Sequence, residues 1–266
     1  MINMNKFNFN IDNLEDDELL SKSSFNHRTQ IDVLYDMIFV DLGLPSGTLW
    51  CKYNVGVEVD KLKKASDWYG KTYSWGETEP KNEYFKGVYK FNKNKKYNAP
   101  RSILELEDDA AYANYAKVKG KVICTPSVED AKELLEYTYL DDTRNYNHVS
   151  ELDGIKLVSN VNKNHIFIPF AGYSLTSIID YHNPNNGGFT YSYTHSEHEI
   201  TDNDVRLTNI SCQNGYTFYL MLNKTCGPRT EKCYTLFGTS GSSRIRVKDT
   251  SDTYLGYTVR AVMKNI

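Results

Sequence analysis

Short segments of β-forming residues, each closed by a turn, restrict the fold of this chain more than any other feature of its sequence. From residue 38 onward, runs rich in Val, Ile, Phe, Tyr and Thr end within a few residues at Gly, Pro or Asn. These runs predict strands at 37–44, 48–56, 121–126, 154–159, 165–173, 188–194, 215–222, 243–248 and 255–263. Because helical patterns do not alternate with the strands, we expect an α+β domain rather than a βαβ repeat.

Two helices are expected between the early and the late strands. The first covers 107–118, and the second covers 127–137, directly after a strand that Pro126 stops. Ser127 is a suitable N-cap for the second helix, and Asp130 at position N3 completes a carboxylate version of the capping box. The apolar face of this helix consists of Val128, Ala131, Leu134 and Leu135.

The stretch at 40–57, VDLGLPSGTLWCKYNVGV, combines turn-forming and apolar residues with almost no charge. Its Pro-Ser-Gly sequence predicts a turn that follows the first strand. We assign Gly43 and Gly47 to backbone conformations that a Cβ atom would obstruct. Trp50 and the later Trp75 are expected to fill the core, with no chemical role.

Residues 1–36 differ in composition from the rest, and we interpret them as an N-terminal arm ahead of a body at 37–266. The arm contains two short helical patterns, the first capped by Asp12 and the second with apolar residues at i, i+3, i+4 and i+7. Because such segments bury too little apolar area to be stable alone, we expect the body or another chain to hold them. The residues assigned to this contact are Leu14, Leu19, Leu20, Ile31, Leu34 and Tyr35.

The overall composition excludes several classes of partner. The chain has 266 residues, of which 40% are hydrophobic, and this is enough for a real core. With 31 basic and 34 acidic residues the formal net charge is -3, so we expect neither a nucleic-acid nor a membrane partner. No apolar run approaches the ~20 residues that span a bilayer. The first residues also lack the apolar region of a secretory signal, so we expect synthesis and folding in the cytoplasm.

The cysteines do not form a recognisable site. Their number is odd, their spacing is wide and no C-x-x-C sequence occurs, so neither a zinc ribbon nor a thioredoxin-like site is expected. We expect buried free thiols in a reducing compartment, while pairing of Cys226 with Cys233 stays open.

Other polar clusters also have plain structural explanations. The oxygen-rich segments at 183–185 and 202–204 are typical of solvated turns, although Ca²⁺ prefers oxygen ligands. The two histidines at 195–198 follow a strand pattern and are expected in a loop, not on a helix that could hold zinc. The carboxylate pairs at 108–109 and 141–142 are expected on the surface, at a helix start and in a loop. We therefore expect no catalytic residue, no metal and no cofactor.

Several blocks of the sequence resemble a known family. The stretch at 40–56, followed by YGKTYSWGETEPKNEY at 69–84, is similar to the major paralogous domain that occurs in many copies in gut and rumen bacteria. The blocks DDAAYANY, TPSVEDAKEL, IFIPFAGY and GYTVRAV follow in the family's order, so the resemblance covers 40–262. It implies a C-type-lectin-like fold, related to formylglycine-generating enzymes and to the variable proteins of diversity-generating retroelements. In such a fold the first and last strands pair and close the domain.

The sequence departs from the family at several places. KVICTPS stands where relatives usually have a W-R-M-P-T type stretch, and TYSYT, with Tyr191 and Tyr193, stands where they usually have Y-W-S-S. The region at 178–239 is longer and more polar than the resemblance implies. We infer that the core is retained and the loops are rebuilt.

The resemblance also implies where a ligand would bind. In variable proteins of this fold, the exposed face near the C-terminal strands is the binding surface, which corresponds here to 227–254. Arginine and aromatic residues dominate binding hot spots. The candidates in this region are Arg229, Tyr234, Phe237, Arg244, Arg246 and Tyr254. The alternative is that they stabilise a sheet edge or a subunit contact.

Three classes of function remain. The first is a non-enzymatic structural or attachment protein of a tailed-phage virion: a fibre, tail or capsid decoration, homo-oligomeric, whose arm docks on other virion proteins and whose body meets a host protein or glycan. The second is a bacterial cell-surface adhesin or pilus tip. The third is a formylglycine-generating type of enzyme, which would need Cys226 and Cys233, and no histidine stands beside either. We expect the first.

Overall fold

The computed structural model describes residues 35–91, 96–97, 99, 101–179, 205–209, 216–226, 231–241 and 245–265. Within them the architecture is strand-rich with few helices, so the α+β prediction is confirmed at this level. The helices are α3 (Ala110–Asn114), α4 (Val128–Tyr137) and the 3-10 turns η3 (Val59–Lys61), η4 (Ala65–Trp68), η5 (Lys86–Val88), η6 (Leu106–Asp108) and η7 (Tyr146–His148). Residues 35–38 form a further helical turn.

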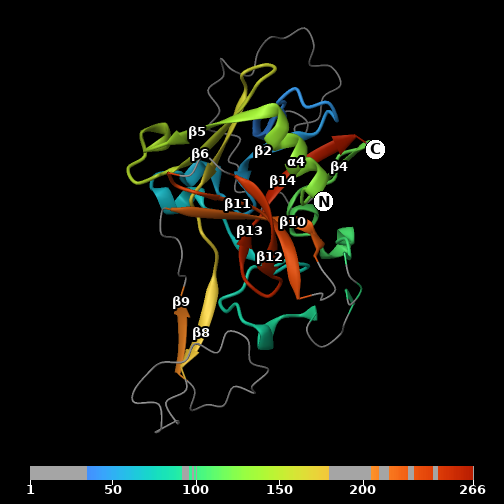
Figure 1. Ribbon diagram of the computed structural model, residues 1–266, viewed down its shortest axis with the longest axis vertical. Helices are drawn as coiled ribbons and strands as arrows, with labels where there is room; N and C mark the ends of the chain where they lie inside the picture. Colours follow the sequence, from blue (N-terminus) through green and yellow to red (C-terminus); the bar gives the residue numbers. More distant parts are fainter. Residues whose placement is uncertain are drawn as a thin grey trace.

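Within the described residues the strands form four sheets, whose arrangement can be followed in Figure 1. The first has the order β1 (Phe39–Val40), β2 (Leu49–Asn54), β14 (Arg260–Asn265), β4 (Lys121–Cys124). The second has the order β12 (Arg246–Asp252), β11 (Lys232–Thr239), β10 (Thr217–Thr225), β13 (Tyr257–Thr258), β3 (Thr72–Tyr73). The third has the order β5 (Thr138–Thr143), β6 (Gly154–Ser159), β7 (His165–Pro169). The fourth is β8 (Leu175–Ile179) with β9 (Val205–Asn209), a ribbon that extends away from the other sheets in Figure 1.

The start and the end of the body pair with each other, but the partner of the last strand is not the expected first strand. β14 is antiparallel to β2, with Val262 opposite Trp50 and Met263 opposite Leu49. The partner of the last strand is therefore β2, while β1 lies at the sheet edge beyond it, with Val40 opposite Trp50. The strand expected at 37–44 is correspondingly short, because the chain after Val40 turns away to the third sheet.

Gly43 lies where that turn approaches the β6–β7 hairpin. Its φ is +65°, and a Cβ atom would lie 2.9 Å from Cγ1 of Val161. Next to it, Ser159 Oγ donates to the Leu42 carbonyl at 2.6 Å and Asn164 Nδ2 donates to the Asp41 carbonyl at 2.8 Å. Gly47 has a φ of +70° with nothing within 4 Å of its Cβ position, so the turn requires its conformation and not its small size.

The second helix was predicted correctly. Ser127 caps α4: its Oγ accepts from Asp130 N at 3.0 Å, and Asp130 Oδ2 accepts from Ser127 N at 2.7 Å. Lys264 of β14 donates to the same carboxylate at 2.5 Å. The apolar residues of α4 lie on a core that also includes Trp50 and inward-facing residues of β6, β7, β10 and β11. Trp50 and Trp75 are both fully buried, as predicted.

The first helix is shorter than the expected 107–118. Asp109 caps α3 and also accepts from Thr125 N and Thr125 Oγ1, which fixes the helix start against β4. Tyr115 then leaves the helical conformation, and its hydroxyl lies 3.2 Å from Cys51 Sγ in the core. Asp108 and Asp109 are buried, which corrects the expectation that this pair is solvated.

Tyr35 belongs to the body, not to the arm. It is only 2% exposed, its hydroxyl donates to the Ala116 carbonyl at 2.9 Å, and its ring meets Phe39 edge-on at 5.7 Å. Of the two partners expected for these residues, the body or another chain, Tyr35 therefore contacts the body. Leu14, Leu19, Leu20, Ile31 and Leu34 lie outside the described residues.

Candidate ligand-binding face

Four side chains gather on one face of the second sheet, across β10, β11 and β12. Tyr219 lies opposite Phe237, and Phe237 lies opposite Arg246 on the other neighbouring strand. Lys248 is two residues along β12 from Arg246, so it lies on the same face. We call these four residues the β10–β12 face. The intervening residues, Phe218, Leu220, Leu236 and Val247, point to the opposite side and pack in the core beneath α4.

The cations of this face lie over its rings. Lys248 Nζ is 5.0 Å from the centroid of the Tyr219 ring and 5.4 Å from that of Phe237. The Arg246 guanidinium carbon is 5.7 Å from the Phe237 centroid, and the two rings are 4.7 Å apart with a tilt of 47°. Such distances allow cation–π attraction, which orients the long side chains before any ligand arrives.

The aromatic rings continue into the core. Tyr173 meets Tyr219 edge-on at 5.2 Å, and Tyr257, which is buried, lies 6.0 Å from Tyr219. Tyr219 and Phe237 are themselves half-buried, so part of each ring reaches the surface. The face is therefore a rigid extension of the packed interior, which reduces the entropy lost on binding.

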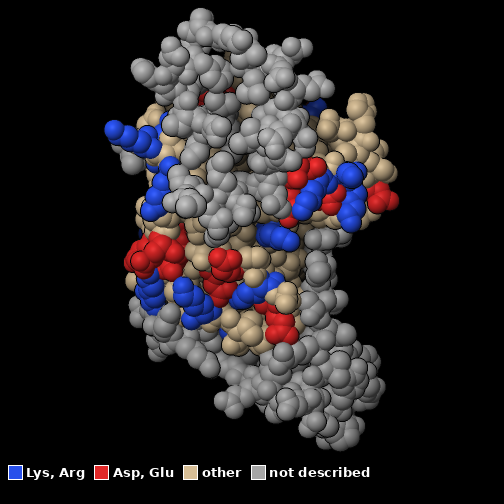
Figure 2. All heavy atoms as spheres, turned by 180° about the vertical axis from the view of Figure 1, so that it is seen from behind, with Lys and Arg blue, Asp and Glu red and all other residues tan. Residues whose placement is uncertain are grey.

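The positive charge of this face is not neutralised within the described part of the chain. There, Lys232 pairs with Asp252, but neither Arg246 nor Lys248 has a carboxylate within salt-bridge distance. Burial, Arg246 and Lys232 lower the pKa of Lys248, and Asp252 opposes this shift only in part. On the side of the molecule in Figure 2, the acidic and basic side chains of the described residues are interspersed.

The structure separates the residues that were expected to form the binding surface. Phe237 and Arg246 lie together on the β10–β12 face. Tyr234 is on the opposite side of β11 and packs against the core. Tyr254 is only 3% exposed, which corrects its assignment to an exposed surface. Arg229 and Arg244 lie outside the described residues.

Tyr219 and Lys248 were missed. Alternation along a strand could have identified Lys248, since it follows Arg246 at i+2. Tyr219 is marked by no comparable signal, because its place beside Phe237 depends on the register between β10 and β11.

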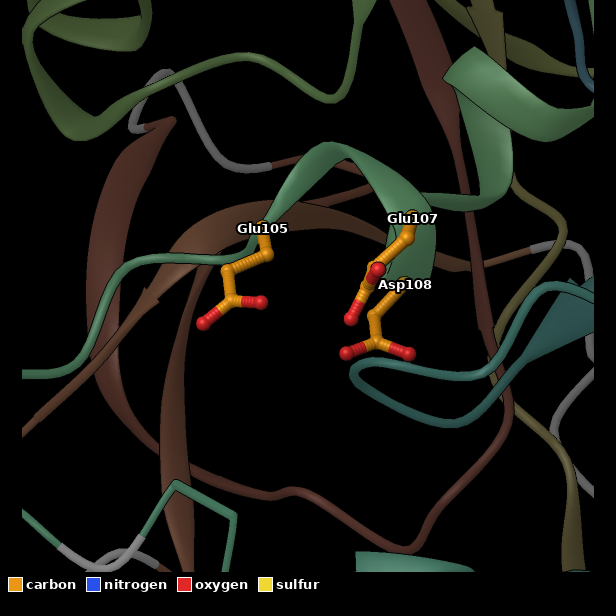
Figure 3. A group of neighbouring side chains, drawn as sticks. All are labelled: Glu105, Glu107 and Asp108. Carbon is orange, nitrogen blue, oxygen red and sulfur yellow. The ribbon is translucent and has the colours of Figure 1, made fainter.

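A second group of charged residues, shown in Figure 3, lies at η6. The carboxylates of Glu105, Glu107 and Asp108 lie close enough together to hold a cation. Lys96 Nζ reaches all three, at 3.0, 2.5 and 2.5 Å, and these interactions raise its pKa. Tyr97 also donates to Asp108 at 2.7 Å. The ammonium group of Lys96 thus takes the central position between the three carboxylates, which fastens the segment around Tyr97 to η6.

The thiols proposed for enzyme chemistry are buried. Cys226 and Cys233 are free, and burial raises the pKa of Cys226 to about 11 and that of Cys233 well above its ordinary value. At neutral pH both are protonated, and a thiol nucleophile must be ionised. Their geometry therefore gives no support to catalysis at this position.

Of the remaining polar clusters, the segments at 183–185, 195–198 and 202–204 lie outside the described residues. Asp141 and Asp142 are exposed, but they lie in strand β5 and not in a loop, and Asp141 pairs with Lys156 at 3.3 Å.

Among the helices that are described, none has the length and apolar character needed to cross a membrane. Comparison of the chain with protein-family models, with curated proteins and with solved structures found no match.

Proposed function

We propose that this chain is a non-enzymatic attachment protein that binds its ligand through the β10–β12 face. One observation carries the proposal: Arg246 and Lys248 lie over the rings of Phe237 and Tyr219 without a carboxylate partner in the described residues. A structural cation on a sheet is usually paired, whereas a preoriented cation beside partly exposed aromatic rings is typical of a binding hot spot.

The fold proposed for the body is C-type-lectin-like. The pairing of β14 with β2 supports it, because this pairing joins the two ends of the body as the family resemblance implies. The order of the sequence blocks supports it as well. In that fold the surface near the C-terminal strands is available for variation, and the β10–β12 face lies on those strands.

The proposed setting is a phage particle. The arm before Tyr35 would dock on other virion proteins, the body would form a homo-oligomer, and the β10–β12 face would meet a molecule on the host surface. Mass spectrometry of purified particles tests this setting, and absence of the polypeptide from them rules it out. Recovery of the chain from a bacterial surface instead would support the adhesin alternative.

A binding assay tests the function itself. The full-length chain is labelled and added to the cells on which the particle grows. The double variant Arg246→Gln/Lys248→Met removes both charges and keeps most of the side-chain volume, so we expect it to fold and to lose binding. Lys119→Met removes one charge from an exposed loop residue and is the matched control. Unchanged binding by the double variant would exclude this face.

A further inference from the structure

We infer that the ligand of the β10–β12 face is an acidic saccharide, with a carboxylate or sulfate on Arg246 and Lys248 and the face of a sugar ring on Phe237 and Tyr219. This inference rests on the proposed function, because it specifies the ligand of the same face. It combines two properties of the face, its unpaired charge and its aromatic surface.

The charge of the face favours an anionic ligand. The Arg246 side chain is exposed, and Lys248 is half-buried against two rings, at 5.0 and 5.4 Å. Within the described residues no carboxylate pairs with either, so a ligand anion is not in competition with an internal one. A guanidinium group binds a planar carboxylate through two parallel hydrogen bonds, and the nearby ammonium adds a further charge-assisted bond.

The rings favour a sugar over other anionic ligands. The C–H groups on one face of a pyranose are apolar and slightly positive, and they pack on the negative face of an aromatic ring. The rings of Phe237 and Tyr219 lie 4.7 Å apart with a tilt of 47°, and both are partly exposed. A sugar ring would take the place of Lys248 and Arg246 over these rings, while its anionic group would hold the two cations beside it. An acidic peptide would use the cations but not the rings.

Single-stranded nucleic acid would also stack on aromatic rings, but it needs a basic groove that follows its backbone. The face has two cations, and the chain as a whole carries a net charge of -3. The charge pattern therefore favours a ligand with one or a few isolated anionic groups.

The test uses the full-length chain and a panel of oligosaccharides. The acidic members are oligogalacturonate, oligomannuronate, oligosialic acid and chondroitin sulfate, each with a carboxyl-reduced or desulfated twin. Calorimetry is expected to detect at least one acidic member, to show roughly tenfold or greater weakening for its neutral twin, and to show affinity that falls with added salt. Equal affinity for a twin, or binding of none of the panel, would overturn the inference.

Single substitutions test whether the residues of the β10–β12 face bind the saccharide. We expect Lys248→Met and Arg246→Gln each to weaken binding of the acidic saccharide by roughly tenfold. Phe237→Leu should weaken it while preserving the salt dependence, and Lys119→Met should leave it unchanged. Thermal unfolding of each variant checks that the fold is retained. Equal weakening by Lys119→Met would mean non-specific attraction and would contradict the inference.

Polyglutamate and single-stranded DNA are the competing probes. Preference for either over every saccharide would overturn the inference. If all saccharides fail while cell binding still depends on Arg246 and Lys248, the acidic-saccharide inference is wrong and the proposed function stands. If cell binding does not depend on them, both are wrong.

Discussion

Arg260 and Asn54 face each other across β14 and β2, and Arg260 Nε donates to Asn54 Oδ1 at 2.8 Å in the fully buried interior. The same guanidinium donates to the carbonyl groups of Cys51, Lys52 and Phe167. One side chain near the C-terminus thus joins β14 to the beginning of the body and to β7. Burial lowers its pKa to about 10, and at neutral pH it still carries its charge.

Replacement of Arg260 by Met should therefore destabilise the fold strongly. It leaves several buried carbonyl oxygens without a donor, each of which costs about 1–3 kcal/mol, so we expect a loss of at least about 3 kcal/mol. Urea unfolding, monitored by circular dichroism, measures this loss in the free energy of unfolding. Arg144→Met, which breaks an exposed pair with Asp153, should cost less than about 1 kcal/mol. Similar losses for both variants would contradict the role assigned to Arg260.

Gly43→Ala and Gly47→Ala separate the cost of backbone conformation from the cost of a clash. Both residues have positive φ, but only Gly43 has a close neighbour, Val161. We expect about 1 kcal/mol for Gly47→Ala and about 2–3 kcal/mol for Gly43→Ala. Since Val161 is 60% exposed, adding Val161→Ala should recover about 1 kcal/mol in the Gly43 variant. No recovery would show that the contact with Val161 is unimportant.

The boundary of the arm is tested by two truncations. Removal of residues 1–34 keeps Tyr35 and should leave a stable body that no longer assembles with its partner. Removal of 1–36 also deletes the buried Tyr35 ring and should lower the free energy of unfolding by about 3 kcal/mol more. Urea unfolding compares the two, with Tyr35→Ala in the full chain as a control. Equal stability of both truncations would place the boundary after Tyr35.

The buried carboxyl group of Asp109 should make the stability of the fold depend on pH, and the direction of its pKa shift sets the sign of this dependence. Burial raises the pKa of Asp109, and hydrogen bonds from Thr125 lower it only in part. A carboxyl whose pKa is higher in the folded chain prefers the proton there, so its contribution to stability falls as pH rises above the unfolded value of 3.8. The stability of the natural chain minus that of Asp109→Asn should therefore fall as pH rises above about 4.

Urea unfolding at several pH values in this range measures the difference. Asp141→Asn, which removes an exposed carboxylate from β5, is the control for the lost charge. A difference that is constant or grows with pH would show that burial does not dominate at Asp109.

Local patterns predicted part of the fold, and tertiary contacts decided the rest. Neighbouring residues determine the N-cap at Ser127 and the strand at 154–159, so the sequence was sufficient for them. The strand expected at 165–173 begins as predicted but ends at Pro169. β5 was missed because both faces of TYLDDT are mostly exposed, which removes the alternation that marks a strand. β11, which carries Phe237, was missed although its Tyr, Thr and Phe residues favour a strand. The strand expected at 188–194 lies outside the described residues.

The candidate site was predicted only in part for the same reason. Phe237 and Arg246 could be named as residue types that bind ligands, but their companions depend on sheet register. Tyr254 also belongs to a residue type that binds ligands, but it is buried. Ser74 Oγ donates to its carbonyl at 2.9 Å, and Trp75 N donates to the carbonyl of the adjacent Thr253 at 2.8 Å. Only the tertiary structure distinguishes these two environments.

The central claim is that the β10–β12 face contacts the ligand, and lysine footprinting tests it most directly. The full-length chain is acetylated free and bound to its target cells, and the modification of Lys248 and Lys119 is quantified by mass spectrometry. We predict that Lys248 becomes protected on binding while Lys119 is modified equally in both states. Equal modification of Lys248 in the free and bound chain would contradict the claim.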